Sequence, residues 1–351
     1  MNTLTVCASG SYDVQIGRNL YGNLGQEARK LVKSKKAAII SDSNVWPLYG
    51  DVIKNSLLSA DFDVIHFVFP AGESSKNGNT YLSILNFLAE NHFTRSDLLV
   101  ALGGGVVGDI TGFAAATFLR GVAYIQIPTT LLSMVDSSVG GKTAIDLPAG
   151  KNLAGAFYQP KLVLCDIQAL NTLPTEVFRE GCAEVIKYSI LYDSKLFEHL
   201  QVRALNFDRQ SVITRCIELK RDVVAADEFD RGARQKLNLG HTIGHGVEAA
   251  SAFSLSHGAA VAIGTAIISR AAMQFGYCSQ ETTDSIIHML TEFKLPISTD
   301  INSAAIFENA LSDKKRSGNT VNLIIPQAIG NCVIAPVSLD QMKSFIEAGL
   351  L

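Results

Sequence analysis

The strongest constraint on the fold is a change of hydrophobic period near the middle of the chain. In the first half, short runs rich in β-branched residues alternate with segments of helical period. The runs cover residues 36–42, 62–69, 98–102 and 122–127, and residues 1–6 add an opening strand. Strands separated by helix-length segments favour a mostly parallel sheet that is covered by helices. The first half is therefore predicted to be an α/β domain of the nucleotide-binding type.

After Asp166 the pattern becomes helical. Apolar residues recur with a helical period over 175–192, 211–226, 242–252, 259–275 and 280–293, and a strand signal returns only at 320–325. Thr172 can cap a helix and Pro174 suits a first helical turn, so residues 171–174 form a natural junction. We predict two domains: an α/β NAD-binding domain with a mostly parallel sheet over 1–170, and an all-α, mainly helical domain over 171–351 that binds metal and substrate.

Length, charge and cysteine pattern narrow the class of protein. A chain of 351 residues with 47% hydrophobic residues can build two cores. A net charge of -3 creates no field that attracts nucleic acid, and no apolar run reaches the length of a membrane span. The six cysteines contain no C-x-x-C pair and are predicted to be reduced core thiols. We therefore expect a cytoplasmic protein whose partners are small molecules, without nucleic acid or membrane contacts.

Two histidines one helical turn apart, His241 and His245, indicate a metal site in the second half. Their spacing places both imidazoles on one helix face, and His257 and Glu184 are further candidate ligands. A zinc protease of the H-E-x-x-H type needs a glutamate directly after the first histidine, where this chain has Thr242, so peptide hydrolysis is disfavoured. The spacing leaves open a site of His241, one other histidine and an acidic ligand, with free positions for a hydroxyl-bearing substrate. The alternative is that the histidines are merely hydrogen-bonded at the edge of a core.

A glycine-rich turn, Gly-Gly-Gly-Val-Val-Gly-Asp at 103–109, joins a predicted strand to a helical pattern at 110–118. Such a turn lets the backbone approach a pyrophosphate at a helix N-terminus. It does not follow the first strand, and no acidic residue ends the next strand, so it is either an unorthodox dinucleotide site or a tight turn. Polar residues after two other strands fall at the same edge of a parallel sheet: Asp42, Asn44, Glu73 and Lys76. Asp42 and Glu73 can equally be helix caps or turn residues.

Residues 128–155 are dense in small and polar side chains. They can present Asp136, Lys142, Lys151 and Asn152 to a polyol or a phosphate, or they form a glycine-rich surface loop. The run Gly-Lys-Thr at 141–143 is not a P-loop, because the first glycine of that motif would fall on Asp136.

A basic series follows downstream and consists of Lys187, Lys220, Arg234, Lys314 and Lys315. Arg234 lies four residues before Asn238, a spacing that directs its guanidinium towards the histidine site, where it suits a carboxylate. The pair at 314–315 alone is typical of a solvated face.

Together these motifs resemble the 3-dehydroquinate synthase family. The resemblance is carried by colinear stretches at 103–109, 128–132 (Pro-Thr-Thr-Leu-Leu), 135–143 (Val-Asp-Ser-Ser-Val-Gly-Gly-Lys-Thr), 150–152 (Gly-Lys-Asn), 183–188 (Ala-Glu-Val-Ile-Lys-Tyr), 237–245 (Leu-Asn-Leu-Gly-His-Thr-Ile-Gly-His) and 256–258 (Ser-His-Gly). It covers nearly the whole chain. It implies a homodimeric enzyme of the shikimate pathway that makes 3-dehydroquinate and phosphate from 3-deoxy-D-arabino-heptulosonate 7-phosphate, with bound NAD and a divalent metal, zinc or cobalt.

The resemblance also implies roles for individual residues. The metal ligands would be Glu184, His241 and His257, so that His245 becomes a contact for the phosphate. NAD would contact Asp42, Asn44, Glu73, Lys76, Gly105, Val106, Val107, Gly108, Asp109, Thr129, Thr130, Lys142, Lys151 and Thr172. The catalytic residues would be Asp136, Lys142, Lys187, Asn238 and His245. The substrate would contact Asn152, Lys220, Arg234, one of Lys314 and Lys315, and Arg120 from a neighbouring subunit.

The implied reaction begins when NAD+ takes hydride from a ring carbinol at the metal. Phosphate is then eliminated, the hydride returns, the ring opens and an aldol step closes the carbocycle. This chain departs from the family at Ala259 and Asp230, where glutamate is frequent, and both departures bear on the tuning of the metal rather than on activity.

Three alternatives stay open at this point. One is another sugar-phosphate cyclase, acting on sedoheptulose 7-phosphate or glucose 6-phosphate. Another is a metal-dependent glycerol or alcohol dehydrogenase that releases NADH, and the third is an inactive NAD-binding regulator. Arg234 and Lys220 favour a carboxylate-bearing substrate over the other cyclase substrates. The dense basic set argues against a dehydrogenase, and the complete ligand set argues against a regulator.

Overall fold

The computed structural model describes residues 1–311 and 320–350, which divide into two compact units. The first unit contains Met1–Pro174 and Ile213–Phe229, and the second contains Thr175–Val212 and Asp230–Leu351. The chain therefore passes from one unit to the other three times. Residues 213–229, whose helical pattern had placed them with the second half, pack with the first unit.

A seven-stranded sheet forms the centre of the first unit, in the order β1-β2-β9-β6-β5-β3-β4. Its strands are β1 (Asn2–Val6), β2 (Tyr12–Gly17), β3 (Lys36–Asp42), β4 (Asp63–Phe69), β5 (Leu98–Gly103), β6 (Ala123–Pro128) and β9 (Leu162–Asp166). β1 pairs antiparallel with β2, and every other neighbouring pair is parallel. The predicted mostly parallel sheet is confirmed.

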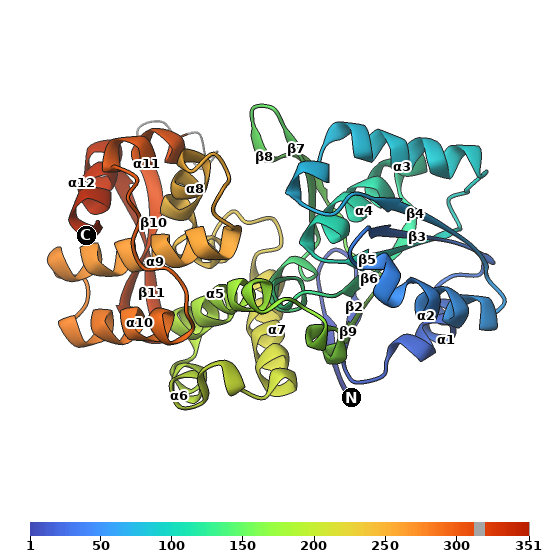
Figure 1. Ribbon diagram of the computed structural model, residues 1–351, viewed down its shortest axis with the longest axis horizontal. Helices are drawn as coiled ribbons and strands as arrows, with labels where there is room; N and C mark the ends of the chain where they lie inside the picture. The colour runs from blue at the N-terminus through green and yellow to red at the C-terminus, as the bar shows by residue number, and fades with distance from the viewer. Residues whose placement is uncertain (312–319, 351) are drawn as a thin grey trace. The chain divides into compact units, whose positions relative to one another are not determined.

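Helices cover both faces of this sheet (Figure 1). The four covering helices are α1 (Leu24–Leu31) and α2 (Trp46–Ser59) on one face, and α3 (Gly78–Glu90) and α4 (Gly105–Thr117) on the other. Ile40 of β3 and Leu99 of β5 are fully buried against Val107 and Ile110 of α4. Burial on both faces explains why these strands are continuous apolar runs rather than alternating ones.

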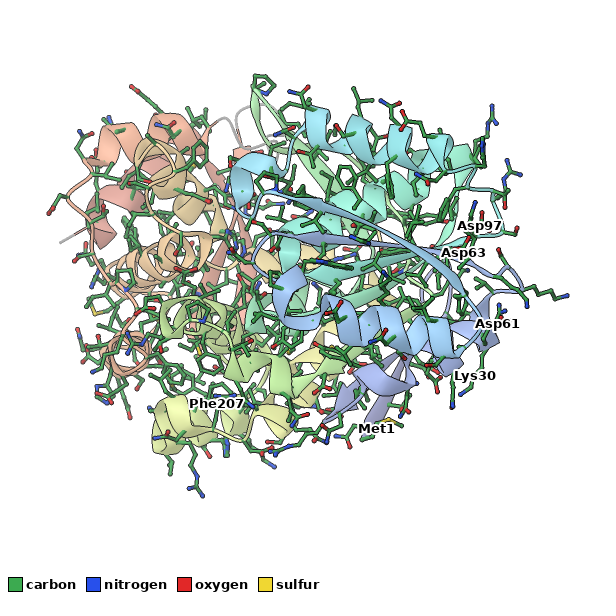
Figure 2. All side chains as sticks on the ribbon, turned by 45° about the vertical axis from the view of Figure 1, so that its right-hand side comes forward. Met1, Lys30, Asp61, Asp63, Asp97 and Phe207 are labelled. Atoms are coloured by element: carbon green, nitrogen blue, oxygen red, sulfur yellow. The ribbon has the colours of Figure 1, made fainter. Side chains whose placement is uncertain are left out.

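The strand order creates a switch point beside β3. β4 lies on one side of β3 and β5 on the other, although all three run in the same direction. Ligands of such sheets bind at the carboxyl ends of the strands next to the switch point. Asp63 opens β4 and Asp97 directly precedes β5, and Figure 2 shows both at the same end of the sheet, which is the amino end. The loops that follow β3, β4 and β5 therefore lie at the opposite end.

Two further elements complete the first unit. They are a hairpin of β7 (Lys142–Leu147) and β8 (Gly150–Phe157) and most of α7 (Arg209–Ala226). Glu228, just after α7, accepts hydrogen bonds from the backbone N and Oγ of Ser9 at 2.7 and 2.6 Å and from Nε2 of Gln159 at 2.8 Å. Hydrogen bonds thus connect the returning segment, residues 213–229, to Ser9 near the start of the chain and to Gln159 near the end of residues 1–174.

The second unit is mainly helical, as predicted. Its helices are α5 (Thr175–Tyr192), α6 (Ser194–Arg203), α8 (His241–Ala250), α9 (His257–Gln274), α10 (Gln280–Glu292), α11 (Ser303–Ala310) and α12 (Leu339–Gly349). One hairpin, β10 (Thr320–Ala328) with β11 (Asn331–Ser338), contains the strand expected at 320–325. α9 is buried along most of its length and forms the core of the unit.

Short turns of 3-10 or π type connect these elements. They are η1 (Tyr21–Asn23), η2 (Glu73–Ser75), η3 (Phe118–Arg120), η4 (Ser133–Ser137), η5 (Ile167–Asn171), η6 (Ala204–Asn206) and η7 (Ala233–Asn238). Among the helices of the described residues, none combines the length and the apolar character needed to cross a membrane.

The cysteines depart in part from the prediction of core thiols. Four are buried: Cys165, Cys182, Cys216 and Cys332. Cys7 is exposed, because it directly follows β1 at the edge of the sheet, so the prediction is wrong there. Cys278 is partly buried.

Candidate functional site

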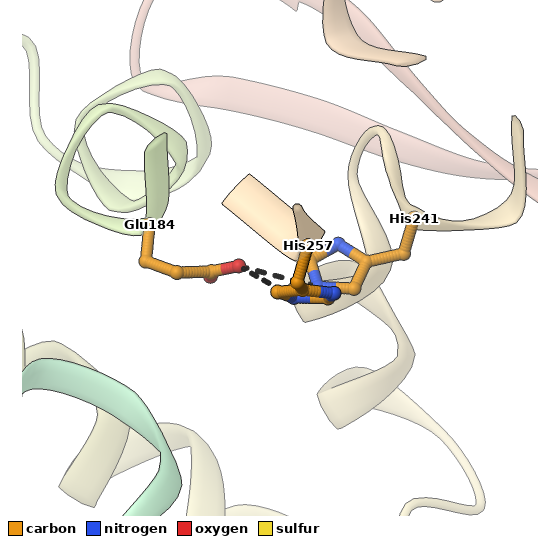
Figure 3. Close-up of side chains that lie close together, drawn as sticks. All are labelled: Glu184, His241 and His257. Carbon is orange, nitrogen blue, oxygen red and sulfur yellow. Dashed lines mark ion pairs between the residues drawn. The ribbon is translucent and has the colours of Figure 1, made fainter. Parts of the chain in front are cut away.

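Three side chains of the second unit converge on one point. Glu184 lies within α5 and is 1% exposed, while His241 and His257 are the first residues of α8 and α9. Oε1 of Glu184 lies 3.3 Å from Nε2 of His241 and 3.5 Å from Nε2 of His257 (Figure 3). Ligands of a tetrahedral zinc ion, each at about 2.0–2.1 Å from the metal, are separated by about 3.3–3.4 Å. The three atoms therefore have the spacing of metal ligands.

Glycines allow the three helices to bring these ligands together. Gly240 caps α8 with φ +75°, and a Cβ there would lie 2.2 Å from Oγ1 of Thr265. Gly258 follows His257, and its Cβ would lie 2.4 Å from the carbonyl oxygen of Glu180 on α5. Real Cβ atoms do not approach other atoms this closely, so larger residues would push α9 away from α5 and α8.

The second ring nitrogen of each histidine also faces an acceptor. Nδ1 of His241 lies 3.0 Å from the carbonyl oxygen of Leu239 and can donate its proton there, which leaves Nε2 as the ligand atom. Nδ1 of His257 lies 3.8 Å from Oε2 of Glu248, a carboxylate that is 3% exposed. Glu248 was not predicted from the sequence, although its place three residues after His245 puts both side chains on one face of α8.

Burial and neighbouring charges shift the pKa values of His241, His257 and Glu184 in different directions. Burial, together with Lys187, lowers the pKa of His241 to about 4, so its imidazole is neutral. Burial also lowers the pKa of His257, but Glu184 and Glu248 outweigh it and raise the pKa to about 9. Burial alone would raise the pKa of Glu184, yet Lys187 and His241 hold it well below the usual range. A cation bound here would replace the proton on His257, because metal ligands must be deprotonated.

Lys187 is buried beside the centre. It lies one helical turn after Glu184 on α5, is 2% exposed and forms an ion pair with the Glu184 carboxylate. A lysine is rarely buried this completely unless it is paired. The Lys187 ammonium therefore balances the charge of the Glu184 carboxylate beside the candidate metal position.

His245 belongs to a neighbouring group. His245, Glu248 and His257 also offer ligand atoms close to one another, and the His245 and His257 rings are 5.9 Å apart. The His241 and His245 rings are also close, at 5.5 Å, but the two histidines belong to different ligand groups. His241 faces Glu184, His245 is grouped with Glu248, and His257 belongs to both groups.

The turn before α8 carries two more predicted residues. Arg234 in η7 is 1% exposed, and Asn238 ends that turn and donates Nδ2 to the carbonyl oxygen of Gln235 at 2.9 Å. Both lie in the turn that leads into α8, and the direction of the Arg234 guanidinium towards the histidine site stays a prediction. Lys314 and Lys315 lie outside the described residues.

Several of the predicted nucleotide contacts lie in loops that follow the strands of the first unit. Gly104 caps α4, and Gly105 begins its first turn, whose backbone N–H groups are suited to bind an anion. Asp42 accepts hydrogen bonds from the backbone N of Asn44 at 2.8 Å and of Val45 at 2.9 Å, so it is also a turn cap. Thr129, after β6, is 4% exposed, and its Oγ1 has no hydrogen-bond partner in the described part of the chain.

Lys76 and Asp109, both predicted to contact NAD, are paired with each other. Nζ of Lys76 lies 2.5 Å from Oδ2 of Asp109 and 2.6 Å from Oδ1 of Asn152. Burial raises the pKa of the Asp109 carboxyl, and the Lys76 ammonium opposes this shift. Glu73 and Lys151 form a looser pair at 3.5 Å.

The remaining predicted residues of the first unit are dispersed over several elements. Asp136 lies in the π-helical turn η4, and Nζ of Lys220 contacts both its carboxylate and its carbonyl oxygen, the latter at 2.6 Å. Lys142 opens β7 and is exposed, and the hydroxyl of Thr172 lies 2.5 Å from that of Tyr49. Thr130, which follows β6, forms hydrogen bonds with Ser133. Arg120 is exposed and has φ +66°.

The fold is shared with solved structures of two synthases and, at a lower similarity, of a dehydrogenase. A structure of 2-deoxy-scyllo-inosose synthase with carbaglucose-6-phosphate, NAD+ and Co2+ matches with a TM-score of 0.88 and 24% identity, over 99% of this chain and 100% of that one. The 2-epi-5-epi-valiolone synthase of Streptomyces hygroscopicus, with NAD+ and Zn2+, matches at 0.88 and 25% identity over 99% and 98%. Glycerol dehydrogenase from Schizosaccharomyces pombe is more distant, at 0.64 and 19% over 96% and 88%. These likenesses define the class of fold to which the chain belongs.

Sequence comparison narrows this class to one family. Residues 66–180 match the model of the 3-dehydroquinate synthase N-terminal part, and residues 181–316 match that of the C-terminal part. The 3-dehydroquinate synthase of Pelobacter propionicus is 43% identical, covering 97% of this chain and 98% of its own. That of Clostridium acetobutylicum is 41% identical and covers 99% of both. The chain belongs to the 3-dehydroquinate synthase family, which confirms the resemblance carried by its motifs.

Proposed function

We propose that the protein is a phosphorus–oxygen lyase that converts 3-deoxy-D-arabino-heptulosonate 7-phosphate to 3-dehydroquinate and phosphate, with NAD and a divalent metal. The observation that carries the proposal is the buried centre of Glu184, His241 and His257, at metal-ligand spacing, in a chain of this family. Structures of the same fold that hold NAD+ with Co2+ or Zn2+ support the choice of cofactors.

The residues present fit both groups. One carboxylate and two imidazoles form a typical donor set for zinc or a similar divalent ion, and three protein ligands leave a position for substrate oxygen. In the first unit, the first turn of α4 suits a pyrophosphate, and the buried hydroxyl of Thr129 offers a partner to a bound nucleotide.

When bound, the metal and NAD supply a Lewis acid and a reversible hydride acceptor. The chain itself binds and orients the substrate. Lys142, Asn238 and His245 would hold the phosphate until it leaves, and Arg234 with Lys220 would bind the substrate carboxylate. Lys187 keeps the Glu184 carboxylate ionised and oriented. The net reaction releases phosphate without net oxidation, so NAD is regenerated in every cycle.

A coupled assay tests this proposal. Purified protein with NAD and zinc or cobalt is offered the heptulosonate phosphate, while released phosphate and NADH absorbance are followed together. Phosphate release without accumulation of NADH is expected, and His257→Ala is expected to abolish it. Absence of phosphate release, or steady accumulation of NADH with glycerol as substrate, would overturn the proposal in favour of a dehydrogenase.

A second candidate is a cyclase for a sugar phosphate without a carboxylate, because two such enzymes share this fold at a TM-score of 0.88. The assay therefore includes sedoheptulose 7-phosphate and glucose 6-phosphate. Turnover of either alternative substrate in preference to the heptulosonate phosphate would establish the second candidate.

We also propose a homodimer in which Arg120 reaches the phosphate bound by the neighbouring subunit. Leu119 and Arg120 both have positive φ, at +50° and +66°, and such strain in bulky residues is often retained for function. Mixing Arg120→Ala with Glu184→Gln tests this. Each heterodimer then contains one complete site out of two. About half of the dimers in a re-equilibrated equal mixture are heterodimers, so the mixture should regain about a quarter of wild-type activity. No recovery would show that Arg120 acts within its own subunit or not at all.

A cytoplasmic location stays a prediction.

A further inference from the structure

Lys76 is buried where three segments of the first unit meet. It lies directly after η2, in the loop that follows β4, and is 5% exposed. Its Nζ contacts Oδ2 of Asp109 on α4 at 2.5 Å and Oδ1 of Asn152 on β8 at 2.6 Å. The Lys76 ammonium therefore connects α4 to the β7–β8 hairpin.

The backbone ties the same loop to the hairpin. The backbone N of Asp146 donates to the carbonyl oxygen of Lys76 at 2.8 Å, and Asn77 and Asp146 form a parallel bridge. The carboxylate of Asp146 accepts a hydrogen bond from the backbone N of Asn152 at 2.7 Å. Asn152 has φ +54°, a left-handed conformation that asparagine tolerates better than most residues. These contacts hold both the backbone and the side chain of Asn152.

Charge and donor chemistry indicate what Lys76 does there. An ammonium already paired with a buried carboxylate is neutralised and contributes little as a point charge towards a phosphate. It can, however, set the orientation of an amide. Because Oδ1 of Asn152 accepts from Lys76, the other polar atom of that amide, Nδ2, is a donor and suits a hydroxyl or phosphate oxygen.

We propose that Lys76 is a positioning residue for substrate binding. It holds the amide of Asn152 in the orientation that donates to the substrate, and through Asp109 it joins this contact to the nucleotide-binding helix α4. The inference rests on the proposed function, since it requires that Asn152 contacts the substrate. Lys76 then acts on the substrate through Asn152, in addition to any contact with NAD.

A double-mutant cycle tests this mechanism. The variants Lys76→Met, Asn152→Ala and their combination are compared by kcat/KM at saturating NAD. Each single change is expected to lower kcat/KM by about tenfold to a hundredfold, the effect of losing a hydrogen bond that involves a charged group, mainly through KM. The combination should be no worse than Asn152→Ala, because Lys76 acts through that residue. Losses that multiply would overturn the proposal, as would a Lys76→Met variant that changes only the Kd of NAD.

A readout that is independent of turnover follows the hairpin itself. Hydrogen exchange of the backbone over residues 146–153 should be faster in Lys76→Met than in the wild type and unchanged in Lys33→Met, an exposed lysine of the same unit. Equal exchange in all three proteins would contradict the link.

A second variant keeps the proposal testable if Lys76→Met does not fold. Asp146→Ala removes the carboxylate contact to the backbone of Asn152 but keeps the backbone hydrogen bond from Asp146 to Lys76, and should raise KM about tenfold with the Kd of NAD unchanged. An unchanged KM would count against the proposal. Inactive wild-type protein would refute the proposed function, whereas the exchange experiment would still decide whether Lys76 holds the hairpin.

Discussion

The variant Glu184→Gln tests the metal centre and a buried ion pair in one experiment. In the metal-free protein, Glu184 and Lys187 are paired with side chains that are 1% and 2% exposed. Removing one partner of a buried pair costs about 3–5 kcal/mol, because the other charge stays buried without compensation. At roughly 2–4 °C per kcal/mol for a unit of this size, the unfolding midpoint should fall by about 6–20 °C.

A second substitution isolates the contribution of the pair. In Glu184→Gln/Lys187→Met the unpaired ammonium is removed and His257 keeps Glu248 as its partner, so stability should return to within about 2 kcal/mol of the wild type. Unfolding is followed by circular dichroism in the presence of a chelator. Glu198→Gln, at an exposed position of α6, is the control and should stay within about 0.5 kcal/mol of the wild type.

Metal affinity should not recover with stability. Both glutamine variants lack a ligand, so zinc binding, measured by competition with a chromophoric chelator, should weaken by more than the roughly 100-fold that loss of a supporting partner costs. Wild-type zinc affinity in Glu184→Gln would show that this carboxylate is not a ligand. Unchanged stability in the same variant would refute the reasoning about the buried charge.

Four further predictions address other features. Gly258→Ala should destabilise the protein by about 1–3 kcal/mol and weaken zinc binding, because its Cβ would lie 2.4 Å from the carbonyl oxygen of Glu180; wild-type values of both would show that α5 and α9 can separate freely. Gly105→Val should weaken NAD binding at least about tenfold in calorimetry, and unaltered affinity would place the pyrophosphate elsewhere. Arg234→Ala should raise KM for the carboxylate-bearing substrate at least about tenfold with little effect on the Kd of zinc, whereas equal losses would make Arg234 structural. Chelation should abolish activity reversibly and leave the helical dichroism intact, since the ligands lie on packed helices; unfolding on chelation would indicate a structural metal.

The sheet could be predicted because its signals are local. β3 occupies residues 36–42, and α5 occupies 175–192, both as predicted from runs of apolar residues between turn residues. Central strands covered on both faces are continuous apolar runs, and their length separates them from helices. The glycine turn at 103–109 was similarly recognisable, because close approach of a backbone to a helix terminus needs glycine in a short stretch of chain.

The ligand set could not be chosen from spacing. His241 and His245 share one face of α8, so helical periodicity treats them alike. What distinguishes them is that Glu184 comes from α5 and His257 from α9, and the packing of those helices decides which histidine faces the carboxylate. Family motifs pointed to the same three residues, but only through resemblance.

Polar contacts between residues far apart in the sequence could not be predicted from local sequence patterns. The residues that Lys76 contacts lie 33 and 76 positions away along the chain. No periodicity or motif links such positions, since the contacts exist only after the sheet has brought the loop, α4 and the hairpin together. The same applies to residues 213–229, whose helical pattern contains nothing that reveals which core they join.

That returning segment has a consequence for biosynthesis. The ribosome delivers residues 175–212 of the second unit before it delivers the helix that completes the first, which buries Ile213, Cys216, Ile217 and Val224. A nascent chain that stops at Pro174 would expose the apolar surface that this helix covers, and such intermediates are prone to aggregate. The α/β unit therefore cannot be completed before residues 213–229 have been synthesised, which happens only after the first part of the second unit has been made.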